Sequence, residues 1–101
     1  MNEYQLALSV EVRELLDATA AEMVELFGIS RAEAIARINE RWHGQDFSGD
    51  DEMILHEDRH YWAMFVYYDG AVPDWSDDAD RSGWVPRPAP PRDSGHWTVP
   101  G

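Results

Sequence analysis

Apolar and polar positions change rhythm within the first 45 residues. Between Tyr4 and Leu8, apolar side chains occupy every second position, which is the period of a strand with one buried face. From Leu8 to Phe27 the period becomes helical, because apolar residues return every three or four positions. We therefore predict a short strand over residues 4–8 that leads into a helix beginning at about Val10.

A second helix is predicted directly after the first. Gly28 follows the last apolar position of the first helix and suits the left-handed conformation in which many helices end. Ser30 and Glu33 stand at the spacing of a capping box, which places the first residue of the second helix at Arg31. The apolar stripe of this helix ends before Gly44 and consists of Ala34, Ile35, Ile38 and Trp42. The two helices should pack together as a pair.

The middle of the chain carries two short apolar runs on either side of a polar stretch. The second run is aromatic and β-branched at consecutive positions and stops at Asp69 and Gly70. Such a composition favours a buried strand. We predict an antiparallel hairpin in which residues 53–57 pair with residues 61–68. A helix capped by Asp58 is the alternative.

From residue 70 onward the pattern becomes irregular. All six prolines lie in this part of the chain, and proline is excluded from helix interiors and from most ladder positions. An acidic cluster at 74–80 precedes a run at 86–91 that is typical of polyproline II. Tryptophan is costly to leave in water, so we expect parts of this extension to dock on the core through its tryptophans. They are Trp75, Trp84 and Trp97.

Together these elements predict an α+β fold in which a helix pair packs on a small antiparallel sheet. A chain of 101 residues holds one modest core, so we expect a single domain over residues 1–69. Residues 70–101 form the irregular Pro- and Trp-rich C-terminal extension. The core is expected to contain Leu15, Leu16, Met23, Phe27, Ile35, Ile38, Trp42, Ile54, Phe65 and Val66.

The net charge of the chain limits the kinds of partner that it can bind. Twenty acidic residues stand against eight basic ones, and the net charge is −12. Such a surface is repelled by nucleic acid phosphates and by anionic lipids, and it is steered toward basic surfaces. The helix pair resembles a helix-turn-helix DNA reader in outline, yet residues 1–45 carry eight acidic residues against four arginines, a net charge of −4. We therefore expect neither a nucleic acid nor a membrane as partner.

Acidic side chains gather on one side of the first predicted helix. Their spacing places them on the face opposite the apolar stripe. A row of this kind is the ordinary solvated face of an amphipathic helix, and it is also a surface to which a basic protein would be drawn. We take its members as candidate partner-binding residues: Glu11, Glu14, Asp17, Glu22 and Glu25.

Residues 56–60 read H-E-D-R-H and resemble the H-E-x-x-H pentad of the zincin metallopeptidases. The resemblance implies two zinc ligands, His56 and His60, and a glutamate, Glu57, that activates a zinc-bound water. That geometry requires a helical pentad, because helical spacing points both imidazoles at one metal. The flanks of this pentad are instead predicted to be strands, which would make it a polar turn.

Two further observations bear on the chemistry. The chain has no cysteine, which excludes thiol nucleophiles, disulfides and thiolate metal sites. Where the extended zincin pattern has a glycine and a third histidine, this chain has Ala63 and Val66. We interpret the chain as a small acidic, non-enzymatic protein-interaction domain without a cofactor. A zinc-dependent hydrolase that uses the pentad is the alternative.

The expected partner is a protein, either one with a basic surface or a second copy of the chain. No apolar run reaches the roughly 18 residues of a membrane span, so we expect a cytoplasmic protein. A composition rich in Ala, Arg and Asp without any Lys suggests a bacterial source.

Overall fold

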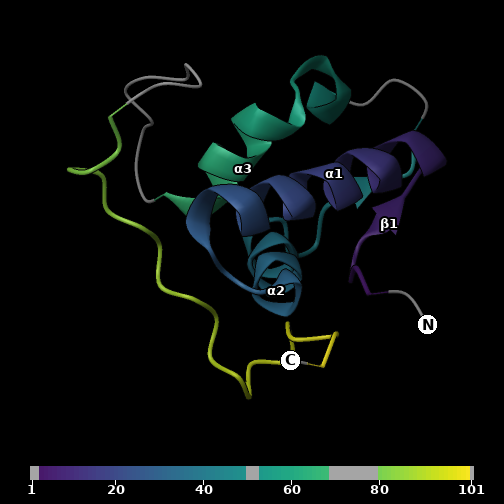
Figure 1. The fold of residues 1–101 in the computed structure, drawn as a ribbon. Coiled ribbons are helices and arrows are strands. Elements are labelled where there is room, and N and C mark those ends of the chain that lie inside the picture. The colour runs from purple at the N-terminus through teal and green to yellow at the C-terminus, as the bar shows by residue number, and fades with distance from the viewer. Residues whose placement is uncertain (1–2, 50–52, 69–79, 101) are drawn as a thin grey trace.

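The structure is a computed structural model that describes residues 3–49, 53–68 and 80–100. Within these ranges the chain forms three α-helices, one 3-10 helix and two very short strands (Figure 1). None of the described helices is both long enough and apolar enough to cross a membrane. In chain order the elements are β1 (Ala7–Leu8), α1 (Val10–Phe27), α2 (Arg31–Arg41), β2 (Asp46–Phe47), η1 (Met53–His56) and α3 (Arg59–Tyr67).

The predicted helix pair is confirmed, with both starts and the end of the first helix where they were expected; the second helix ends at Arg41, slightly earlier than predicted. Helix α1 begins after Ser9, whose hydroxyl accepts a hydrogen bond from the backbone N–H of Val12 at 3.2 Å. It ends at Gly28, where a φ of 68° lies in the left-handed region that favours glycine. Helix α2 begins after Ser30, whose hydroxyl accepts from the backbone N–H of Glu33 at 3.0 Å. Side-chain caps therefore define where both helices start.

The predicted antiparallel hairpin is wrong. Residues 53–56 form the 3-10 helix η1, and residues 59–67 form helix α3. The alternative interpretation is confirmed, because a carboxylate oxygen of Asp58 caps α3 by accepting from the backbone N–H of Tyr61 at 3.0 Å. The run carries apolar side chains on consecutive positions because α3 is covered on more than one side. Periodicity alone cannot distinguish such a buried helix from a buried strand.

The sheet differs from the prediction in both size and direction. Strand β1 pairs with β2 in parallel, with Ala7 opposite Asp46 and Leu8 opposite Phe47. The predicted strand over residues 4–8 is therefore reduced to its last two residues. The fold class is corrected accordingly: in the part of the chain that the structure describes, three helices form the body, and the two-residue ladder only fastens the N-terminal segment to the chain after α2.

Helix α1 is the centre of the fold, because it packs against both α2 and α3 (Figure 1). Seven of the ten predicted core residues are buried, and the other three, Leu15, Phe27 and Phe65, lie partly buried against the core. The prediction missed buried side chains that come from the N-terminal segment and from small residues in the helices. They include Tyr4, Leu6, Val12, Ala20, Ala34, Ala63 and Met64.

The described part of the C-terminal extension, residues 80–100, passes along one side of the molecule and ends beside α2 (Figure 1). The fully buried side chain of Asn39 accepts from the backbone N–H of Gln5 at 2.9 Å and donates to the carbonyl of His96 at 3.0 Å. Arg37 donates to the carbonyl of Arg87 at 2.7 Å. Polar side chains of α2 thus hold both the N-terminal segment and the extension.

Several predictions fall on residues outside the described ranges. They concern the acidic cluster at 74–80 apart from Asp80, the tryptophan at position 75, and the domain boundary between residues 69 and 70.

Candidate binding pocket

The H-E-D-R-H pentad does not lie on one helix. His56 is the last residue of η1, Asp58 is the cap of α3, and His60 belongs to the first turn of α3. The helical spacing on which the zincin resemblance depends is therefore not formed. In the described ranges, no three histidine, aspartate or glutamate side chains are grouped as a metal site would require. The structure places His56 and His60 in different pockets.

The pocket beside His60 lies between α1 and α3 and measures about 500 Å³. The Nδ1 atom of His60 lies 3.1 Å from Oε2 of Glu22, and both side chains are largely buried. The Nε atom of Arg59 lies 3.9 Å from the other carboxylate oxygen of Glu22. Glu22 of α1 therefore contacts two side chains of α3. We name this arrangement the His60 pocket.

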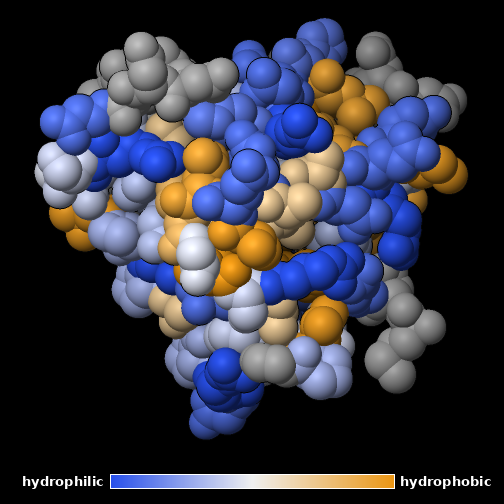
Figure 2. All heavy atoms as spheres, in the orientation of Figure 1, coloured by the Kyte–Doolittle hydropathy of each residue, from blue (hydrophilic) through white to orange (hydrophobic). Residues whose placement is uncertain are grey.

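The acidic row of α1 divides into two groups. Glu22 is used in the His60 pocket, and Asp17 accepts a hydrogen bond from the hydroxyl of Tyr4 at 2.7 Å. Glu11, Glu14 and Glu25 are exposed. Figure 2 shows hydrophilic side chains over most of one side of the molecule, with smaller apolar areas between them. Two of the five candidate partner-binding residues thus contact other side chains, and four of the five, all except Glu22, are exposed.

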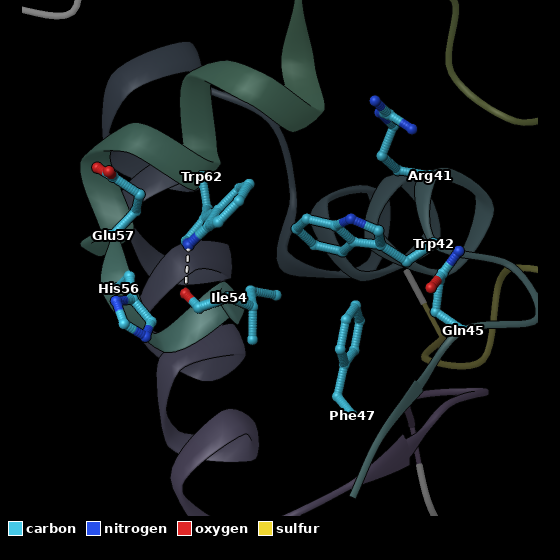
Figure 3. A pocket seen from close by; sticks show the side chains of 8 residues that line it. All are labelled: Arg41, Trp42, Gln45, Phe47, Ile54, His56, Glu57 and Trp62. Carbon is cyan, nitrogen blue, oxygen red and sulfur yellow. Dashed lines mark hydrogen bonds between the residues drawn. The ribbon is translucent and has the colours of Figure 1, made fainter. Parts of the chain in front are cut away.

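A second open pocket of about 500 Å³ lies where α2, β2, η1 and α3 meet (Figure 3). We name it the tryptophan pocket. Figure 3 shows aromatic rings at its centre and polar side chains at its two ends. Its lining consists of Arg41, Trp42, Gln45, Phe47, Ile54, His56, Glu57 and Trp62.

The aromatic walls are fixed by contacts with one another. The ring of Trp42 meets those of Phe47 and Trp62 edge to face, with centroids 5.9 Å and 5.6 Å apart. The indole N–H of Trp62 donates to the carbonyl of Ile54 at 2.8 Å, which ties α3 to η1. Edge-to-face pairs and a hydrogen-bonded indole restrain the rings, so the pocket is largely formed before any ligand arrives.

Local backbone geometry brings these residues together. Trp42 is the C-cap of α2, and its carbonyl accepts from the backbone N–H of Gln45 at 2.9 Å. Gly44, between them, has a φ of 82°, a value that glycine adopts without strain. This turn reverses the chain, so β2 returns along the end of α2 and places Phe47 against Trp42.

One end of the pocket has donors without acceptors. Trp42 is only 8% exposed as a residue, and its indole N–H makes no hydrogen bond to a described residue, although this atom is not itself among the buried unpartnered ones. The Nε atom of Arg41 is buried and likewise has no acceptor within the described ranges. The guanidinium carbon of Arg41 lies 4.2 Å from the ring centre of Phe65. Burial lowers the pKa of Arg41, and the nearby charge of Arg87 lowers it further.

The opposite end of the pocket is acidic. Glu57 and His56 lie together on one side in Figure 3, and Arg41 and Gln45 lie on the other, with the tryptophan rings between them. Glu57, His56 and Gln45 are exposed. The pocket therefore has a direction: a carboxylate at one end and unpaired donors at the other.

No pattern in the sequence marks this pocket. Trp42 was assigned to the core alone, and Trp62 and Phe47 were given no role. The high tryptophan content, five in 101 residues, is the one signal that pointed to aromatic binding surfaces. Comparisons of the chain with protein family models, with curated proteins and with solved structures find no match.

Proposed function

We propose that the protein is a non-enzymatic binding module that takes an apolar side chain of a protein partner into the tryptophan pocket. The observation that carries this proposal is the open aromatic enclosure formed by Trp42, Phe47 and Trp62. Sites for small ligands and inserted side chains are concave, mostly apolar and supplied with a few polar groups. A volume of about 500 Å³ is sufficient for one aromatic side chain.

The rigidity of the walls supports binding rather than mere packing. A ligand that enters a preformed pocket does not have to order the side chains that receive it, and this ordering is a large part of the cost of association. Buried aromatic anchors also dominate the energetics of protein interfaces. The pair formed by Trp42 and Trp62 therefore offers a suitable receptor for one anchoring residue.

The charge of the chain supports a partner with basic residues around the anchor. The net charge is −12, and a carboxylate, Glu57, stands at the pocket itself. Exposed acidic side chains also remain on α1, at Glu11, Glu14 and Glu25. Charges of this kind raise the association rate with a basic partner, and they do so less at high salt.

A peptide library displayed on phage tests the proposal. Selection on the wild-type protein should recover peptides that contain an aromatic residue close to lysine or arginine. These peptides should bind Phe47→Ala at least about tenfold more weakly, a loss of about 1.4 kcal/mol. Val85→Ala is the matched control, because Val85 is apolar, 66% exposed and outside the pocket.

Two results would count against the proposal. Selected peptides that bind Phe47→Ala and wild type equally would place the binding surface elsewhere. Stoichiometric zinc in the purified protein, lost in His56→Ala, would support the hydrolase interpretation instead, although the structure has His56 and His60 in separate pockets.

A further inference from the structure

Two neighbouring residues supply the unpaired donors of the tryptophan pocket. The indole N–H of Trp42 and the Nε–H of Arg41 both lack an acceptor within the described ranges. The large majority of buried donors in proteins are paired. The other described tryptophan of the pocket, Trp62, does have a carbonyl acceptor at 2.8 Å. Of these two donors only the Nε atom of Arg41 is buried. The indole N–H of Trp42 is open to solvent, so a ligand with an acceptor atom can reach it.

The charge at this end specifies the kind of acceptor. Arg41 is partly buried, and its guanidinium group has no ion pair with a described carboxylate. The charged group whose field acts on it is a second arginine, Arg87. A guanidinium in such a setting is best matched by a carboxylate, which accepts charge-assisted hydrogen bonds from it. The positive charge of Arg41 and Arg87 is a local exception in a protein whose net charge is −12.

We propose that the tryptophan pocket recognises the free C-terminal end of a polypeptide partner. The apolar side chain of the last residue lies between Trp42, Phe47 and Trp62. Its terminal carboxylate accepts hydrogen bonds from Arg41 and from the indole of Trp42. A basic residue that precedes it faces Glu57 at the other end of the pocket. This inference rests on the proposed function and adds the chemical class of the ligand.

A chain terminus fits better than an internal aspartate or glutamate. The last residue of a polypeptide carries its side chain and its carboxylate on the same Cα atom, so one residue fills both the aromatic walls and the donor end. An internal acidic residue has a polar side chain and leaves the aromatic walls to a neighbour. The opposite placement of Glu57 and Arg41 in Figure 3 also matches a basic segment that ends in a carboxylate.

The test uses one acetylated five-residue peptide with two lysines and a C-terminal phenylalanine, prepared as the free acid and as the carboxamide. Binding is followed through the indole ¹⁵N–¹H signals of the wild-type protein. The acid should bind at least about tenfold more tightly than the amide, which corresponds to about 1.4 kcal/mol. This comparison needs no variant, so it does not depend on how a substitution affects folding.

Variants then locate the carboxylate. In Arg41→Gln and in Trp42→Phe the preference for the acid should fall below about threefold, a difference of less than about 0.7 kcal/mol. Arg59→Gln is the matched control for charge, because the side chain of Arg59 is 63% exposed and lines the other pocket. It should keep the full preference for the acid.

The possible outcomes separate this inference from the proposed function. Acid and amide that bind equally, with shifts of the Trp42 and Trp62 signals, would overturn the carboxylate assignment and leave the binding module standing. Peptides that shift neither signal would contradict both. N-acetylphenylalanine that binds as tightly as the peptide acid would assign the pocket to a small aromatic acid and overturn the assignment to a chain terminus.

Discussion

The two pockets on either side of α3 have the same volume, about 500 Å³, and opposite chemistry. In the His60 pocket, His60 and Arg59 both turn to the carboxylate of Glu22. In the tryptophan pocket, the donors of Arg41 and Trp42 have no acceptor within the described ranges. The first pocket therefore holds a charged contact that joins two helices, whereas Arg41 at the second has no ion pair with a described carboxylate.

The recognisable motif and the pocket that we propose as a binding site therefore do not coincide. The H-E-D-R-H motif includes His60, but the structure pairs this side chain with Glu22 in a contact between α3 and α1. The residues with unused donors lie at the end of α2, where no motif marks them. Polar groups that satisfy one another stabilise a fold, whereas a buried polar group without a partner calls for an explanation, such as a bound water, an ion or a ligand. Substitutions in each pocket separate these two roles.

The largest effect is expected from removing a wall of the tryptophan pocket. Trp62→Ala should lower the free energy of unfolding by about 3 kcal/mol, because the ring packs on Trp42 and donates to the carbonyl of Ile54. Trp62→Phe keeps an aromatic ring and should lose about half as much. Chemical denaturation measures both. If Trp62→Ala is as stable as wild type, the contacts of Trp62 with Trp42 and Ile54 do not stabilise the fold.

The contact between helices in the His60 pocket should affect stability and leave binding unchanged. Glu22→Gln removes the charge that His60 and Arg59 share and should cost about 1–2 kcal/mol of unfolding free energy. Glu25→Gln makes the same change at an exposed position and should cost less than about 0.5 kcal/mol. A Glu22→Gln protein that loses peptide binding would contradict the division between the two pockets.

The unpaired arginine should show the reverse behaviour. Arg41→Met replaces the guanidinium group over the Phe65 ring with a thioether and removes a partly buried charge close to Arg87. We expect the unfolding free energy to rise by about 0.5–1 kcal/mol, while peptide binding is lost. Thermal denaturation and peptide titration together check this result. A clear loss of stability would show that Arg41 is a structural residue.

The smallest effect on stability is expected at an arginine that does form an ion pair, Arg31. Arg31 donates to both carboxylate oxygens of Glu3, at 2.6 and 2.9 Å, and this pairing holds the pKa of Glu3 below its usual value of 4.5. Because the folded pKa is lowered, the stabilisation is present above pH 4.5 and is lost as the pH falls through the folded pKa. In Glu3→Gln, this part of the acid-dependent loss of stability should disappear. If Glu3→Gln and wild type lose the same amount of stability between pH 5 and pH 3, the Glu3–Arg31 pair does not contribute to the acid dependence.

The parts of the fold that were predicted correctly are those defined by local signals. Ser30 and Gly28 mark helix ends by their own chemistry, and the structure has the caps where the sequence indicates them. Helix α3 was misassigned because its aromatic and β-branched composition outweighed the capping signal of Asp58. The deciding factor is tertiary: α3 packs against α1, and no described strand lies beside it.

The tryptophan pocket could not be predicted because it depends on contacts between residues that are distant in sequence. Trp42 and Trp62 lie on different helices, and Phe47 reaches them through the turn at Gly44. The absence of an acceptor for Arg41 is also visible only in three dimensions, since 20 acidic residues in the chain would suggest a partner for every arginine.

The most direct test of the account is a titration of the wild-type protein with the acetylated peptide acid, followed by ¹⁵N–¹H spectra that include indole, guanidinium and imidazole signals. The account predicts saturable shifts at the indoles of Trp42 and Trp62 and at the Nε–H of Arg41, with the imidazole signals of His60 unchanged. Shifts centred on His60, with the signals of Trp42 and Arg41 unmoved, would contradict it.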